Sequence, residues 1–222
     1  DLEYRQQIRL LGLLYKGKPA DTTEIKEWAA SPSYYRKRTL LRILPIAVTV
    51  INFLCISLAI LGIISANIAG GVFVSFVLFS TIFSKGITKL QTTYGEKLQV
   101  LSTYADQILL TEQKEMHSHI LQELKADLTS QNQTASQAVR QLSKLMNALD
   151  QRSNLLMSTI LNGLIFWELR QVMRIEKWKE IHASDLPRWI ETIGEIDAYC
   201  SLATFAYNHP DYIYPTIAAQ SF

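Results

Sequence analysis

Metal binding is the first chemistry that the residue types suggest, because Glu115, His117 and His119 lie close together. Ligands on one helix must share a face to reach the same ion, which a spacing of three or four residues provides. His117 and His119 are two positions apart and therefore face different sides of a helix. A solvated helix surface explains them better than a metal site. His182 and His209, near expected helix ends, suit capping or helix-dipole roles.

Nucleotide binding and nucleophilic catalysis need motifs that the sequence lacks. A phosphate-binding P-loop reads GxxxxGK[ST], but Gly17-Lys18 has no earlier glycine at the required spacing. The sequence also has no HExxH motif of zinc proteases, no GxSxG motif of hydrolases and no GxGxxG motif of dinucleotide-binding folds. We therefore predict no catalytic, cofactor-binding or metal-ligating residue, and no cofactor, in this chain itself.

Phosphate binding is the chemistry that a cluster of four cations offers, at Arg36, Lys37, Arg38 and Arg42. Phosphates of nucleic acid and of lipid headgroups are both suitable ligands. The net charge is only +2 over 222 residues, so the chain as a whole is not a polyanion-binding surface. Because the cluster directly precedes an apolar run, lipid headgroups or membrane topology explain it better than nucleic acid does.

The apolar run extends from Ile43 to Ser84 without any Asp, Glu, Lys, Arg or His. A bilayer core of ~30 Å is crossed by about 20 apolar residues in a helix, so the run predicts two spans and a turn. Small and turn-forming residues favour a turn at Ser65–Gly71. Ile43–Ser65 is long enough to cross alone, and Ile68–Ser84 is near the lower limit. We expect a helical hairpin with membrane lipids around residues 43–84.

The flanks of the hairpin predict its orientation. Cations precede it, and Lys85 and Lys89 follow it, so the positive-inside rule puts both flanks in the cytoplasm and the turn outside. Tyr34 and Tyr35 lie where interfacial aromatic residues are found. The expected location is thus an inner, cytoplasmic membrane. The alternative is a cytoplasmic protein in which the hairpin is the buried centre of a soluble bundle.

The remainder of the chain predicts an all-α fold in a reducing compartment. Strand-like alternation is absent, only six prolines and nine glycines occur, and Leu, Ile, Ala, Gln, Lys and Glu dominate. Cys55 and Cys200 have no spacing suited to a metal or a disulfide. Short N-terminal helices are expected over residues 1–16, from Asp21 with Glu24 as capping-box partner, and from an N-cap at Ser31-Pro32.

Two long antiparallel arms are predicted after the hairpin, giving a lever-like bundle. Apolar residues recur every three or four positions over Lys89–Leu128 and again over Thr134–His182. The polar cluster Ser130–Gln133 is the expected turn, and Leu186–Tyr207 should pack near the open end of the pair.

The second arm should present one apolar seam to the first. Met146 and Ile160 are expected on this seam, so both should belong to the interface between the arms. Trp167, Trp178 and Trp189 suit core positions better than a stacking platform. Asn154 and Asn162 suit hydrogen bonds to a neighbouring helix better than ligand contacts.

The last expected helix and the residues after it carry an ordered set of positions: Glu195, Ile196, Asp197, Leu202, Ala203, Ala206, Tyr207, Tyr212, Pro215 and Ile217. This order resembles the end of the helical core, or lever, domain of the MutS mismatch-repair family. There an E-[IL]-D-x-x-x-x-L-A-x-x-A-Y helix leads through a Y-x-x-P-x strand into an ATPase domain. The resemblance covers about residues 140–220, and Leu149–Asn162 is similar to the MutS-related subgroup with predicted membrane spans.

The sequence pattern divides the chain into short helices over 1–40, the hydrophobic hairpin over 41–88 and a helical remainder over 89–222. The resemblance implies that this remainder is a core or lever domain that ends at the junction to an ATPase domain. The chain begins at Asp1 instead of Met and ends in mid-pattern, so we expect a longer protein. Its C-terminal domain would carry Walker motifs, hold ATP and Mg²⁺, and dimerise. No mismatch-reading domain with its aromatic wedge is visible, and a membrane hairpin differs from a sliding DNA clamp.

The function implied by the resemblance is a helical relay in an ATPase related to DNA mismatch repair. It would couple the ATP state to a distant region that binds DNA or another partner, while the chain itself would not be an enzyme. The first alternative is a non-enzymatic, membrane-anchored scaffold that recruits cytoplasmic partners. A further alternative is a soluble DNA-binding bundle.

Overall fold

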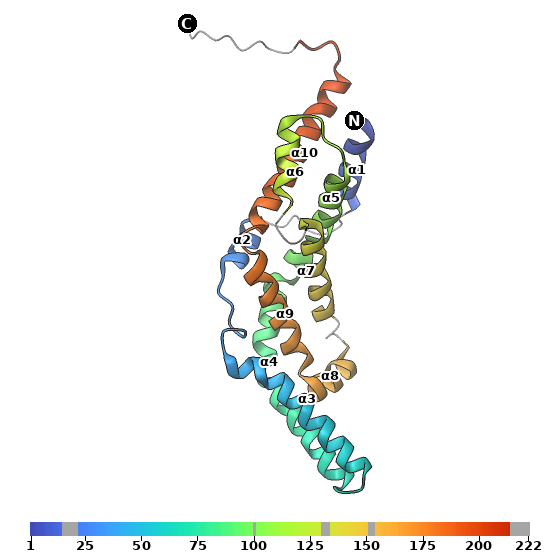
Figure 1. Ribbon diagram of the computed structural model, residues 1–222. Helices are drawn as coiled ribbons and strands as arrows, with labels where there is room; N and C mark the ends of the chain where they lie inside the picture. The colour runs from blue at the N-terminus through green and yellow to red at the C-terminus, as the bar shows by residue number, and fades with distance from the viewer. Residues whose placement is uncertain (15–21, 100, 130–133, 151–153, 214–222) are drawn as a thin grey trace.

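The computed structural model of the chain describes residues 1–14, 22–99, 101–129, 134–150 and 154–213. Over these residues the fold is all-α, as the sequence predicts, with one isolated bridge between Thr129 and Thr134. Figure 1 shows an elongated molecule, with the α3–α4 hairpin at one end and α1 and the end of α10 toward the other. The helices are α1 (Leu2–Leu14), α2 (Thr22–Ala30), α3 (Thr39–Ile60), α4 (Ala66–Gln99), α5 (Leu101–Gln113), α6 (His119–Asp127), α7 (Ala135–Asp150), α8 (Leu155–Ile165), α9 (Trp167–His182) and α10 (Leu186–Asn208).

The apolar run forms the α3–α4 hairpin, but its turn comes earlier than the predicted one. Residues 61–65 connect the two helices, and the expected turn Ser65–Gly71 lies mostly inside α4. Gly62 has a φ of 73°, which glycine adopts without a steric cost. The prediction was wrong because it followed a cluster of small residues, whereas the backbone needs a single glycine at the left-handed position.

The helical body next to the hairpin has a core between α5, α7, α9 and α10. α5 and α7 run antiparallel, since Arg140 pairs with Asp106 at 2.7 Å and Ser136 N donates to Glu112 Oε1 at 3.0 Å. This pair keeps part of the predicted arrangement of the arms. Side chains buried in the core include Leu101, Ala105, Ile108, Ala138, Leu142, Val172 and Ile193.

The first predicted arm, Lys89–Leu128, is not one helix. Residues 114–118 are non-helical and separate α5 from α6. Lys125 Nζ donates to Lys114 O at 2.7 Å, so a side chain of α6 stabilises the break. α6 then packs on α10, where Arg188 pairs with Asp127. α10 therefore begins beside the end of α6, and its expected place at the open end of the arms was wrong.

The second predicted arm, Thr134–His182, folds back on itself at Phe166, which has left-handed backbone angles of φ 49° and ψ 51°. α9 returns along α7, and Trp178 Nε1 donates to Ala138 O at 2.8 Å. Met146 on α7 is buried, whereas Ile160 on α8 is 49% exposed, so they do not share a seam. Periodicity carries no signal for a non-glycine residue at positive φ, and the predicted seam ran straight through it.

The N-terminal segment packs on the body. α1 buries Tyr4 and Ile8, and Tyr4 Oη lies 2.9 Å from Thr111 Oγ1 of α5. The predicted helix from Ser31-Pro32 was wrong, because residues 31–38 are non-helical and lead into α3. Several positions used in the sequence analysis lie outside the described residues: Gly17-Lys18, Asp21, Ser130–Gln133, Pro215 and Ile217.

Candidate functional site

The histidines considered for metal binding belong to no group of ligands in the described part of the chain. His117 is in the non-helical segment 114–118, and His119 faces Glu123 one helical turn away at 3.5 Å. In the described part of the chain, no three His, Cys, Asp or Glu side chains are grouped so that they could hold a metal ion. His209 caps the end of α10 and stacks on Tyr212 with a ring distance of 4.7 Å.

A P-loop type of nucleotide site has no counterpart among the described glycines. Gly62 lies in the hairpin turn, and the others with described surroundings lie inside helices: Gly12, Gly70, Gly71, Gly86, Gly163 and Gly194. None of these belongs to a glycine-rich loop that could surround phosphates with backbone N–H groups.

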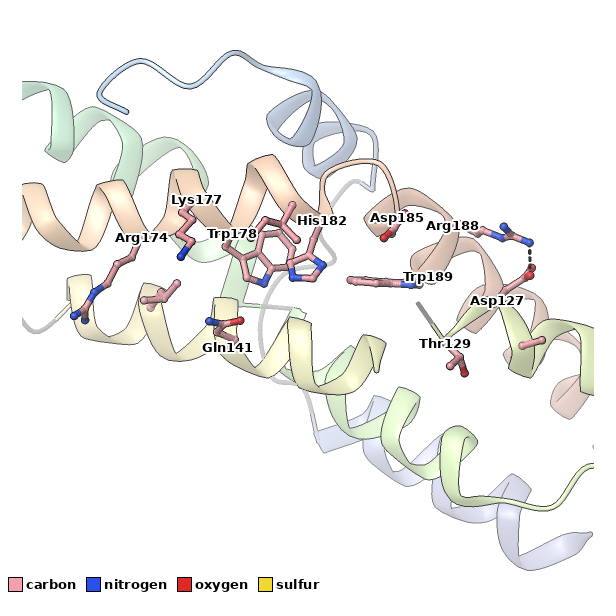
Figure 2. Close-up of a pocket in the computed structure, with 13 residues that line it drawn as sticks. Asp127, Thr129, Gln141, Arg174, Lys177, Trp178, His182, Asp185, Arg188 and Trp189 are labelled. Carbon is pink, nitrogen blue, oxygen red and sulfur yellow. Dashed lines mark hydrogen bonds and ion pairs between the residues drawn. The ribbon is translucent and has the colours of Figure 1, made fainter. Parts of the chain in front are cut away.

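An open cleft of about 1180 Å³ lies between α6, α7, α9 and the start of α10 (Figure 2). We call it the tryptophan cleft. His182 stands between Trp178 and Trp189, with ring distances of 5.0 and 5.8 Å. Burial lowers the pKa of His182, and the nearby Asp185 carboxylate opposes that shift. The imidazole is consequently neutral at pH 7.

Cations line the rim of the tryptophan cleft. Figure 2 shows Arg174 and Lys177 directed from α9 toward α7, and both side chains are exposed. Within the described residues, neither makes a hydrogen bond or an ion pair, whereas Arg188 at the other end pairs with Asp127. The cleft is therefore suited to an anionic surface or ligand, with Trp178 and Trp189 serving as core residues as predicted. Trp167 is half-buried.

The α3–α4 hairpin presents a continuous apolar surface. Thr39–Ile60 and Ala66–Thr92 are each long and apolar enough to cross a membrane, with mean hydropathies of 2.5 and 1.9. In the most apolar part of the first helix, only 17% is buried by the rest of the chain. In the most apolar part of the second helix, nothing is buried. Side chains more than half exposed are Ile43, Ile46, Val50, Phe53, Leu54, Ile60, Leu61, Ile63, Ile68, Val74, Leu78 and Ile82.

Hydroxyl side chains along the α3–α4 hairpin bond to the backbone of their own helices. Ser57, Ser75 and Thr81 each donate to a carbonyl one turn earlier in the same helix, at 2.6–2.8 Å. Such bonds are suited to a helix in hydrocarbon, where an unpaired hydroxyl would be costly.

A buried carboxylate joins the hairpin to the body. Glu176 of α9 accepts hydrogen bonds from the backbone N–H groups of Tyr34, Tyr35 and Arg36 at 2.7, 3.0 and 2.6 Å. These bonds fix the loop that leads into α3, and Arg36 also pairs with Glu180 at 2.6 Å. Sequence reasoning missed Glu176, although a charged residue next to the apolar Ile175 on the seam was a usable signal.

The two amide residues of α8 stabilise its ends. Asn154 is the N-cap and accepts from Met157 N at 3.2 Å. Asn162 Oδ1 accepts from Glu168 N at 3.0 Å, so it bonds to the neighbouring helix α9 as expected.

Comparisons of the chain with protein families, curated proteins and solved structures find no match.

Proposed function

We propose that this chain is a membrane-anchored helical body, with the α3–α4 hairpin in the bilayer and both soluble flanks in the cytoplasm. The observation that carries the proposal is the apolar surface of the hairpin, which the other helices leave largely uncovered. In a soluble bundle this surface would have to be covered by protein, because contiguous apolar patches of this extent are rare on soluble monomers. In the membrane, lipid acyl chains cover this apolar surface instead of protein.

The cations at the base of the hairpin support the orientation. Arg38 at the start of α3 and Lys89 on α4 line the same pocket of about 800 Å³, so the two helices enter and leave on one side. Arg38 also stacks over the ring of Tyr34 at 4.6 Å, an arrangement suited to the polar edge of a bilayer. Both features fit the positive-inside rule with the hairpin turn on the far side.

Within this anchored body we infer a relay role in a MutS-like ATPase related to DNA mismatch repair. The inference rests on the ordered residues of α10, two of which are open to a further domain: Leu202 and Tyr207 are 65% and 62% exposed. ATP, Mg²⁺ and dimerisation would belong to that further domain, and DNA to a distant binding region. The chain would transmit the nucleotide state between the two.

The relay role and the scaffold alternative make different predictions for any sequence that a parent gene encodes after Phe222. A GxxxxGK[ST] motif there supports the relay and contradicts a non-enzymatic scaffold, whereas its absence contradicts the relay. The isolated chain should hydrolyse no ATP above a buffer blank. Its binding to duplex DNA should be weak and should fall steeply with salt, as expected for a few phosphate contacts.

A further inference from the structure

α8 is a second uncharged surface beside the hairpin. The sequence between Arg152 and Glu168 contains no charged residue and no histidine. α8 exposes Leu156, Met157 and Ile160 by 79%, 55% and 49%. Its 11 residues extend about 17 Å, which is too short to cross a bilayer core of ~30 Å. A membrane helix of this length has to enter and leave on the same side.

The contacts of α8 place it beside the middle of α3. Asn52 Nδ2 donates to Gly163 O at 2.9 Å and to Leu164 O at 3.2 Å. Asn52 is nine residues beyond Ile43, about 14 Å along the helix. Beyond Asn52, α3 has only eight residues before it ends at Ile60, about 12 Å. A hairpin that crosses the bilayer therefore takes the end of α8 into the hydrocarbon with it.

We propose that α8 and the first turn of α9 form a re-entrant element, which enters the bilayer beside α3 and α4 and returns to the same side. This inference rests on the proposed membrane insertion of the hairpin. The lipid acyl chains would cover Leu156, Met157 and Ile160 as a continuation of the apolar surface of the hairpin.

The backbone carbonyls at the end of α8 are hydrogen-bonded, as a position in hydrocarbon requires. The last carbonyls of a helix lack partners within the helix, and hydrocarbon offers none. Asn52 bonds two of these carbonyls, and Arg170 Nε donates to a third, Ile165 O, at 2.8 Å. The N–H of Glu168 at the start of α9 is bonded by Asn162 Oδ1. Side chains thus bond the backbone C=O and N–H groups between α8 and α9, which would otherwise need water.

Apolar packing closes the turn between α8 and α9. Phe166 is 1% exposed, and its ring lies 6.1–6.3 Å from the rings of Phe76, Phe79 and Phe83 of α4. The first charged groups that return along α9 are buried or bonded: Glu168 is 5% exposed and accepts from Ser158 Oγ at 2.9 Å. Arg170 Nη2 donates to Pro45 O at 2.9 Å and to Thr49 Oγ1 at 2.7 Å. Arg170 therefore lies beside the part of α3 nearest the cationic flank.

Depth-dependent fluorescence quenching tests this placement. The background is the full chain with Cys55→Ser and Cys200→Ser, reconstituted in phosphatidylcholine–phosphatidylglycerol vesicles. Four variants each carry one labelled cysteine: Leu156→Cys and Ile160→Cys on α8, Val74→Cys on the hairpin, and Glu195→Cys at an exposed position of α10. Quenchers are lipids with a nitroxide on the acyl chain and, separately, aqueous iodide.

Labels at 156, 160 and 74 should be quenched by the nitroxide lipids and protected from iodide, and the label at 195 should show the reverse. If 74 is quenched by lipid while 156 and 160 are quenched only by iodide, the re-entrant element is wrong and the anchored hairpin stands. If 74 is itself quenched only by iodide, the membrane insertion of the hairpin is wrong, and the re-entrant element fails with it.

Discussion

At the scale of single residues, Glu176 determines where the hairpin begins. Its carboxylate is the common acceptor for three backbone N–H groups of the loop before α3. Glu176→Gln removes the charge and one acceptor oxygen and leaves a donor of this loop unpaired. We expect a loss of roughly 1–3 kcal/mol in the free energy of unfolding, measured by urea titration in detergent micelles. The matched control is Glu180→Gln, which breaks only the partly exposed pair with Arg36 and should cost about 0–1 kcal/mol. Equal losses for the two variants would refute the role of Glu176.

His182 should make the stability of the helical body depend on pH. Because burial lowers the pKa of His182 below its ordinary value of about 6.5, the unfolded chain binds the proton more readily. The contribution of neutral His182 to the free energy of unfolding is fully present above about pH 6.5. It is lost as the pH falls through the lower pKa of the folded state. His182→Phe keeps a ring between Trp178 and Trp189 and should reduce this loss. The measurement is the thermal midpoint between pH 7.5 and pH 5; identical slopes for variant and parent would contradict the prediction.

At the scale of elements, the packing of α8 on α4 depends on the absence of a side chain at Gly163. A Cβ there would lie 2.4 Å from Phe73 Cε2 and 2.5 Å from Val77 Cγ2. Gly163→Ala should therefore push α8 away from the hairpin and lower stability, typically by 1–3 kcal/mol for overpacking. Gly194→Ala in α10 is the control, since its Cβ meets nothing within 4 Å and should stabilise by up to about 1 kcal/mol. Both are measured by urea titration, and a neutral Gly163→Ala would show that α8 is not held where we describe it.

Helices and the hairpin were predictable from the sequence because apolar periodicity and the charge-free run are local signals. The breaks were not predictable, because side chains of other helices stabilise them. Lys125 bonds the carbonyl of Lys114 just after α5, and Asn52 bonds the end of α8 across 111 residues. The tryptophan cleft was missed for the same reason. Trp178 and Trp189 are core residues as expected, but the cleft that they line also needs α6 and α7 beside α9, a packing that local periodicity does not specify.

At the scale of the whole molecule, α9 is the element that connects the membrane end with α10. Its first turn bonds α3 through Arg170, its middle holds the loop before α3 through Glu176, and its last residue, His182, contacts Trp189 of α10. The predicted pair of continuous arms is replaced by shorter helices around this connection. A relay between the bilayer and a domain beyond α10 would therefore pass through α9.

The proposed anchor of the chain in a lipid bilayer is the α3–α4 hairpin. The most direct test is flotation of the detergent-solubilised chain after reconstitution into vesicles, in a density gradient at alkaline carbonate pH, which strips peripheral proteins. We predict that the chain floats with the lipid. A double variant, Val74→Lys and Leu78→Lys, adds two lipid-facing charges, each costing ~2.5–3.5 kcal/mol near a helix centre, and should float less. A chain that stays at the bottom of the gradient and is monodisperse without detergent would contradict the account.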